Sequence, residues 1–287
     1  MISLSPASIR ILRALGIYHY LTKPQMLELG LARSVASLDN HAIKPLVPKV
    51  GAKSSEKLCD RLTYGLRDTD ERPGKNHFLY YLTEVGLDRL CWEFADELES
   101  SVGDLREDTL WVPAPQESLS NDFHHRRHYV SLHIALRKWA AEVGATIDFW
   151  THYYQSYHSK PVARGRPPSI NRLIWDKTTK KTCTPDGILG ITYRGQSRIY
   201  LVELHHKTPT AQIVDQLYRN FRAAQAVKAK FPDYPLTHDP YVLSVFTNPE
   251  DMKAVQERIK CEQAFDAVRQ GLHMTTLDQV AARGLNW

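Results

Sequence analysis

Two apolar runs, residues 187–193 and 198–205, constrain the fold of this chain more than any other feature of its sequence. Both are rich in Ile, Leu, Val and Tyr, and the turn-forming sequence Arg-Gly-Gln at 194–196 separates them. Such a pattern predicts a β-hairpin. Stretches with a helical spacing of apolar residues lie on either side of it, at about 124–143 and 210–230. The hairpin is therefore expected between two long helices.

The remaining elements of the second half complete an alternating pattern. Further strand-like runs occur at 146–152 and 241–246, and helices are expected beyond them to the C-terminus. The order helix, strand, strand, strand, helix, strand predicts an α/β layer architecture with a mixed sheet. We assign this pattern to one domain, residues 122–287.

The N-terminal third predicts a smaller α+β domain. Three short helices come first, with Thr22 and Ser34 as N-caps of the second and the third. A β-hairpin with a long polar tip follows, formed by the runs 61–66 and 77–82, and a further helix comes after it. This order indicates a winged helix-turn-helix domain at residues 1–98.

Composition narrows the class of protein. Residues 99–121, rich in Ser, Asp, Glu and Pro, are expected to form a linker. The chain is 43% hydrophobic and 24% charged, as in folded soluble proteins. Because it has no apolar run of membrane-spanning length and no signal-like start, we expect a cytoplasmic protein without a membrane partner. The four cysteines lie far apart, which argues against a zinc knuckle or a disulfide framework, and the net charge of +5 favours nucleic acid only weakly.

Acidic and basic side chains cluster around the second strand of the central hairpin. Strand side chains alternate between faces, so Glu203, His205 and Lys207 should project to one side, and the hairpin should bring Asp186 alongside them. Two carboxylates and an imidazole at one sheet edge can hold a hard divalent cation. The sequence thus predicts a Mg²⁺ or Mn²⁺ site formed by Asp186, Glu203 and His205, with Lys207 as a fourth catalytic residue, where the cation would polarise a phosphodiester.

These residues also have a structural interpretation. Asp186 follows Pro185 and could simply be a turn residue. Glu203 is harder to explain in this way, because an unpaired carboxylate is costly to bury in an apolar strand. His124 and His128 have the i, i+4 spacing of zinc ligands on a helix, but a polar first turn explains them better. We therefore favour a functional site for the Asp186 set and a structural role for the histidine pair.

Residues for DNA contact are expected on the third helix, as the recognition helix, on the hairpin tip and on a basic loop. Asn and Arg side chains can pair with base edges, whereas Lys44 is expected to meet phosphate. The alternative for the winged helix is protein–protein contact, and a plain surface loop is the alternative for the basic segment. The candidates are Arg33, Ser37, Asn40, His41 and Lys44 of the third helix, Arg72 and Lys75 of the tip, and Arg164 and Arg166 of the loop.

The motif Pro185-Asp186-Gly187, followed by Glu203 and His205 on a helix–three-strand–helix–strand frame, resembles the PD-(D/E)XK nuclease superfamily over about 123–247. It departs from the superfamily pattern because His205 stands where a lysine is usual. Taken with the winged helix, its closing sequence at 80–86, the His-led helix and the aromatic Tyr218, the whole chain is similar to the replication-relaxation family of plasmid and mobile-element proteins, to which MOBC-type relaxases are related. The resemblance implies a role in plasmid replication or DNA transfer.

Two functions follow as hypotheses. The first is a metal-dependent DNA endonuclease that nicks, as a relaxase does, at a site chosen by the winged helix. The second is a catalytically inactive nuclease-fold protein that regulates replication or transcription. In both cases the expected partners are double-stranded DNA and plasmid replication or transfer proteins, and a homo-oligomer is compatible with either.

Overall fold

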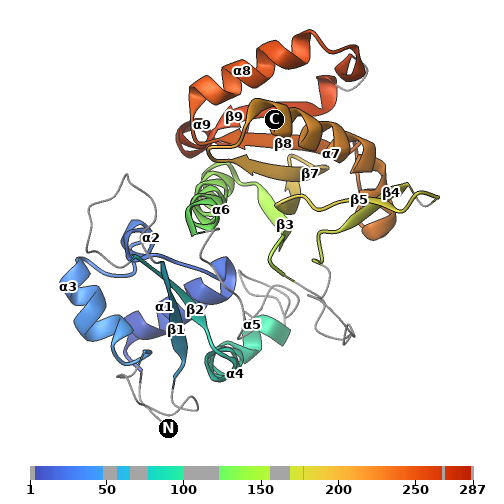
Figure 1. The fold of residues 1–287 in the computed structure, drawn as a ribbon. Coiled ribbons are helices and arrows are strands. Elements are labelled where there is room, and N and C mark those ends of the chain that lie inside the picture. Colours follow the sequence, from blue (N-terminus) through green and yellow to red (C-terminus); the bar gives the residue numbers. More distant parts are fainter. Residues whose placement is uncertain are drawn as a thin grey trace. The chain divides into compact units, whose positions relative to one another are not determined.

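The computed structural model describes residues 4–47, 57–64, 77–99, 123–155, 169–176, 178–266 and 269–285. The chain divides into two compact units, Met1–Ile134 and Ala135–Trp287, and Figure 1 shows the elements of each. The division falls inside the long helix α6 (Phe123–Val143), whose first turns belong to the N-terminal unit. The domain boundaries expected from the sequence stay a prediction, and each unit is described by itself.

The N-terminal unit consists of short helices and one hairpin. Its elements are α1 (Pro6–Tyr18), α2 (Lys23–Glu28), α3 (Val35–Ser37), the π-helix η1 (Leu38–Ile43), β1 (Cys59–Tyr64), β2 (His77–Leu82), α4 (Glu84–Glu93), α5 (Ala95–Glu99) and the start of α6. The predicted caps are present, since the hydroxyls of Thr22 and Ser34 accept N–H groups of the first turns of α2 and α3. Strands β1 and β2 pair antiparallel from Cys59 opposite Leu82.

One glycine fixes how α4 meets this hairpin. A Cβ on Gly86 would lie 1.8 Å from the carbonyl oxygen of Leu58, so no larger residue fits without moving the backbone. The hydroxyl of Thr83 accepts the N–H of Gly86 and donates to the same carbonyl group of Leu58. The Thr-x-x-Gly sequence therefore anchors the start of α4 on the residue before β1.

The C-terminal unit is built on a five-stranded mixed sheet in the order β3-β6-β7-β8-β9. Its elements are β3 (Thr146–His152), β4 (Leu173–Asp176), β5 (Lys181–Cys183), β6 (Gly187–Tyr193), β7 (Gln196–His205), α7 (Thr210–Lys230), β8 (Tyr241–Phe246), α8 (Pro249–Lys260), the 3₁₀ turns η4 (Gln263–Phe265) and η5 (Arg269–Gly271), β9 (Leu272–Thr276) and α9 (Leu277–Arg283). The first three sheet strands pair antiparallel and the last three parallel, so the predicted mixed α/β sheet is confirmed.

The position of α7 follows from the parallel connection between β7 and β8. A crossover of this kind needs a helix that packs back onto the sheet. Apolar residues of α7 do so, with Leu217 fully buried in one core with Leu201 of β7 and Phe246 of β8, and Figure 1 shows α7 lying along these strands. Within the described residues, no helix is both long enough and apolar enough to cross a membrane.

The turn between β6 and β7 differs slightly from the expected 194–196. Only Arg194 and Gly195 form it, with φ values of 50° and 74°. Two consecutive positive φ angles are typical of the two-residue turn that matches strand twist. Gln196 therefore begins β7, and Tyr193 pairs with it across the turn.

Candidate functional site

The central hairpin brings Asp186 next to the strand that carries Glu203. Gly187, the first residue of β6, pairs with Val202, so Asp186 precedes one member of this pair and Glu203 follows the other. Asp186 itself is a bend residue just outside β6. The Oδ2 atom of Asp186 accepts the N–H of Leu204 at 2.8 Å, which holds this carboxylate against β7. The structure thus places Asp186 against the backbone of the residue that follows Glu203, and the site predicted for the two carboxylates stays a prediction.

The backbone that carries Asp186 is anchored from a second side. Asn171 is fully buried, and its Nδ2 donates to the carbonyl oxygens of Pro185 at 3.1 Å and Asp186 at 3.2 Å. The N–H of Tyr153, just after β3, donates to the same Asp186 oxygen at 2.8 Å. Asp186 is therefore held as part of a fixed segment and not as the tip of a loose turn.

Glu203 is only 6% exposed and is held by α7. The Nδ2 of Asn220, which is 1% exposed, donates to Oε1 of Glu203 at 2.6 Å. A hydrogen bond to a carboxylate is stronger than one between neutral groups and favours the charged form. Asn220 was not predicted, although its position was a signal: it is the polar member of the buried stripe of α7 that also contains Leu217 and Ala224.

The pKa of Cys183, at the end of β5, is affected by the charges of Glu203 and Arg219. Its pKa is raised to about 12, first by burial and then by the negative charge of Glu203, while the positive charge of Arg219 acts in the opposite direction. Both charges are thus close enough to act on the same thiol. Arg219, one residue before Asn220 on α7, is therefore a cation close to the site.

His205 shares the face of Glu203 but is engaged with β8. It is 3% exposed, its Nε2 lies 3.0 Å from the hydroxyl oxygen of Ser244, and its ring centroid lies 4.8 Å from that of Phe246. In the parallel register Ser244 stands opposite Glu203, so the imidazole leans along the sheet toward the neighbouring strand. The residue in the position of the usual lysine is thus a packed side chain.

The expectation that Lys207 continues the same strand face is wrong. β7 ends at His205, and Lys207 lies two residues beyond it, exposed and with φ of 53°. Alternation of faces holds only while the backbone stays extended. The catalytic role expected for Lys207 stays a prediction, but strand periodicity no longer supports it.

The residues present suit a divalent cation only in part. In the stretches that the structure describes, which include Asp186, Glu203, His205 and the pair His124 and His128, no group of three or more His, Cys, Asp or Glu is arranged to hold a metal ion. Mg²⁺ in phosphoryl-transfer sites, however, is commonly held by one or two carboxylates together with water and substrate phosphate. The two carboxylates alone therefore fit such an ion.

Comparison of this chain with known proteins found no match. No protein-family model matches the chain, no curated protein matches it, and no solved structure matches its fold. The resemblance to the replication-relaxation family and to the PD-(D/E)XK superfamily stays a prediction that rests on the order of the motifs.

The predicted recognition helix presents its polar residues outward. Arg33, just before α3, and Asn40, His41 and Lys44 of the following turns are exposed, and Ser37 is half-buried. On the opposite side Leu38, Ala42 and Ile43 are buried in the unit. The remaining predicted DNA contacts, Arg72, Lys75, Arg164 and Arg166, lie outside the described residues.

An ion pair ties this helix to its neighbour. The Nζ of Lys23, at the start of α2, lies 2.7 Å from a carboxylate oxygen of Asp39 in η1. The pair joins α2 to η1 through Asp39 and does not use the side chains of Asn40 or His41. A partly exposed pair of this kind contributes little stability by itself.

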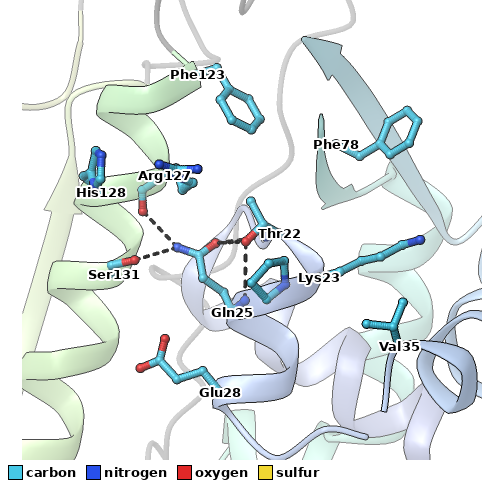
Figure 2. Close-up of a pocket in the computed structure, with 11 residues that line it drawn as sticks. Thr22, Lys23, Gln25, Glu28, Val35, Phe78, Phe123, Arg127, His128 and Ser131 are labelled. Carbon is cyan, nitrogen blue, oxygen red and sulfur yellow. Dashed lines mark hydrogen bonds between the residues drawn. The ribbon is translucent and has the colours of Figure 1, made fainter. Parts of the chain in front are cut away.

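A second polar connection in this unit joins α2 to α6. The Nε2 of Gln25 donates to the carbonyl oxygen of Arg127 at 2.8 Å and to the hydroxyl of Ser131 at 3.0 Å, as the dashed lines of Figure 2 show. Its Oε1 accepts the N–H of Thr22 at 2.9 Å. The sequence Thr-x-x-Gln predicts the capping box but not the contact with α6, because that contact depends on tertiary packing.

Beside this connection lies a cavity of about 630 Å³. Figure 2 shows Phe78 and Phe123 on two of its sides and Gln25 between α2 and α6. The lining residues are Thr22, Lys23, Pro24, Gln25, Glu28, Val35, Phe78, Phe123, Arg127, His128 and Ser131. None of the sequence-predicted site residues except His128 lines it.

Proposed function

We propose that this chain is a DNA-binding protein of a plasmid or mobile element, which acts in replication or mobilisation and nicks DNA at a divalent-metal site formed by Asp186 and Glu203. One observation carries the proposal. Two carboxylates lie at the open end of the hairpin, Asp186 just before β6 and Glu203 within β7, and each is held by its own hydrogen bond, from Leu204 N–H to Asp186 and from Asn220 to Glu203. Rigid support of this kind is typical of functional acidic residues.

The arrangement of the C-terminal unit supports a PD-(D/E)XK assignment. Helix α6, strands β3, β6 and β7, helix α7 and strand β8 follow one another in the expected order, and the four strands are neighbours in the sheet. The acidic residues fall at the motif positions, before β6 and inside β7. In the same way, the helices and hairpin of the N-terminal unit support a winged helix.

DNA recognition is assigned to α3 and η1. Asn40 and Arg33 carry side chains that can pair with adenine and guanine edges in a major groove, while Lys44 is suited to a phosphate. All three are exposed, and the buried side of the same helix anchors it to the unit. A short, well-anchored helix with an outward polar face is what groove insertion requires.

In the nicking site, Asp186 and Glu203 would hold Mg²⁺ or Mn²⁺, which when bound polarises a phosphodiester and lowers the pKa of water. The protein's own part is positioning. Asn220 keeps one oxygen of Glu203 fixed, and Leu204 N–H keeps one oxygen of Asp186 fixed, so that both residues present acceptor oxygens without rearrangement. Such preorganisation is the usual contribution of a protein to a metal site.

One observation favours a second function. His205 occupies the place of the usual lysine but is buried, hydrogen-bonded to Ser244 and packed on Phe246. A lysine in that place would help to stabilise developing negative charge. The second candidate is therefore a regulator that binds DNA through the same fold without cutting it.

A nicking assay separates the two functions. Supercoiled plasmid carrying the native origin region is incubated with the protein and Mg²⁺ or Mn²⁺, and open-circle product is measured. We expect nicking by the wild type, no nicking by Asp186→Ala or Glu203→Ala, and wild-type nicking by the exposed control Asp233→Ala. Binding of duplex DNA should be the same in all four proteins. DNA binding without any nicking by the wild type would identify the regulator.

A further inference from the structure

A second cluster of charged and aromatic residues lies on the outer side of α7. Positions 215, 218, 219 and 222 form one stripe of this helix, since residues three and four apart are neighbours on a helix surface. The small β4–β5 hairpin packs against α7. Together they form what we call the α7–β4 face, whose members are Trp175, Lys181, Tyr218, Arg219 and Arg222.

Cations and rings alternate along this face. The Nζ of Lys181 lies 5.4 Å from the ring centroid of Trp175, and the guanidinium carbon of Arg222 lies 5.4 Å from the same ring. Arg222 also lies 6.0 Å from the ring of Tyr218. These distances are within the range of cation–π contact. The order is therefore lysine, tryptophan, arginine, tyrosine.

The face is accessible, and the charge of Arg222 on it is not neutralised within the described residues. Tyr218 is 38% exposed, and Lys181 and Arg222 are exposed. Asp215 pairs with Arg219 at 2.7 Å. Arg222 forms no ion pair within the described residues, so its positive charge is available to a ligand.

The other carboxylate nearby, that of Asp176, is turned toward its own hairpin. It accepts the N–H groups of Thr178 and Thr179, both at 3.0 Å, and the hydroxyl of Thr179. These hydrogen bonds, first the one from the Thr179 hydroxyl, lower its pKa. Asp176 is thus mainly a turn residue; of the cations of the face, Lys181 is its partner across the β4–β5 pair and also lowers its pKa.

The α7–β4 face adjoins the residue that holds Glu203. Arg219 belongs to the face, and the next residue of α7, Asn220, donates to Glu203. Because Arg219 is paired with Asp215, Arg222 is the cation of α7 that can meet a phosphate. A strand with a phosphate on Arg222 would thus lie within one helical turn of the residue that holds Glu203.

We propose that the α7–β4 face binds a single-stranded segment of nucleic acid and guides its backbone toward Asp186 and Glu203. The exposed ring of Tyr218 can stack on an unpaired base and the cations beside it can meet the phosphates, whereas the bases of a duplex are stacked on each other and offer no free face. An acidic protein segment would use the cations but not the rings. Only the part of the proposal that leads the strand toward Asp186 and Glu203 rests on the proposed nicking function. Binding of single-stranded nucleic acid to the α7–β4 face does not depend on that function.

The test uses the full-length protein in EDTA, so that neither metal binding nor cutting affects the result. Fluorescence anisotropy measures the affinity for a labelled oligo(dT) of about 20 nucleotides and for a duplex of equal length. We expect Tyr218→Ala and Arg222→Ala each to weaken oligo(dT) binding about tenfold. Arg222→Ala should also reduce the slope of log affinity against log salt by roughly one phosphate contact. Duplex binding should not change.

Controls separate stacking from charge and from folding. Tyr218→Phe keeps the ring and should bind oligo(dT) like the wild type, and so should Arg258→Ala, an exposed arginine on α8. Asp186→Ala should also keep oligo(dT) affinity even when it abolishes nicking. Wild-type oligo(dT) affinity in both Tyr218→Ala and Arg222→Ala would overturn the proposal. A loss with Arg222→Ala but none with Tyr218→Ala would overturn it too, and would identify a general polyanion site.

Discussion

The two candidate sites of this molecule are built in opposite ways. The residues of α3 and η1 that we assign to DNA recognition are exposed, and the described contacts of this helix hold its backbone and its buried side but leave Asn40 and Lys44 at the surface. In the carboxylate site, Glu203, Asn220 and Asn171 are buried and hydrogen-bonded. A surface that adapts to a large ligand can have mobile side chains, whereas a site that positions an ion needs fixed ones.

Because of this contrast, replacing a buried asparagine should lower the free energy of unfolding more than replacing an exposed one. The largest effect is expected for Asn171→Ala, because the change removes the donor to the buried carbonyl group of Pro185 and one of the two donors to the carbonyl group of Asp186, which keeps the N–H of Tyr153. A buried carbonyl left unsatisfied costs about 1–3 kcal/mol, and a lost second hydrogen bond costs about 1 kcal/mol. The free energy of unfolding, measured by urea denaturation, should fall by about 3 kcal/mol. A change below about 0.5 kcal/mol would mean that the segment carrying Asp186 is not held as we describe.

A smaller loss of stability is expected for Asn220→Ala. It leaves Oε1 of the buried Glu203 without its donor at 2.6 Å, which should cost about 2 kcal/mol. A supporting residue of this kind also affects ion affinity, and we expect Mn²⁺ to bind about 10–100-fold more weakly. Asn220→Ser, which retains a hydroxyl donor, should recover part of both losses. Equal Mn²⁺ affinity in the wild type and Asn220→Ala would show that Asn220 only stabilises the fold.

The matching substitutions on the exposed helix should leave stability almost unchanged. Asn40→Ala and Lys44→Ala should each alter the free energy of unfolding by less than about 0.5 kcal/mol. Their effects should appear in DNA binding, where Asn40→Ala reduces the preference for the cognate sequence by about 1–3 kcal/mol and Lys44→Ala weakens all sequences alike. Binding to cognate and unrelated duplexes, measured at two salt concentrations, distinguishes these outcomes. If neither substitution changes DNA binding, this helix is not the recognition element.

The smallest expected effect is a pH dependence at the far edge of the sheet. Burial, and then the nearby charge of Arg198, lower the pKa of His273 below its ordinary value of 6.5. As the pH falls, His273 is therefore protonated in the unfolded chain at a higher pH than in the folded protein. Its contribution to the stability of the fold is present above pH 6.5 and is lost as the pH falls toward the lowered pKa. His273→Gln should flatten this part of the stability profile. If the free energy of unfolding of the wild type and of His273→Gln falls in the same way below pH 6.5, this prediction is contradicted.

Much of the carboxylate site could be predicted from the sequence, because its geometry follows from local rules. A two-residue turn between apolar strands sets the register, and the register brings Asp186, just before β6, next to the segment of β7 that contains Glu203. Lys207 was misplaced because the sequence does not mark where β7 stops being extended. Asn220 and Asn171 were missed because their contacts join segments distant in the chain, and no periodic pattern encodes such pairs. The π-helical form of η1 was also not predicted, and we have no physical account of it.

Calorimetric titration of the protein with Mn²⁺ tests the central claim most directly, because it asks whether Asp186 and Glu203 together bind one divalent ion. The wild type, Asp186→Asn, Glu203→Gln and the exposed control Asp233→Asn are compared at the same pH. The account predicts one binding site in the wild type and in the control, and none in either site variant. Equal Mn²⁺ binding by all four proteins, or no binding by the wild type, would contradict it.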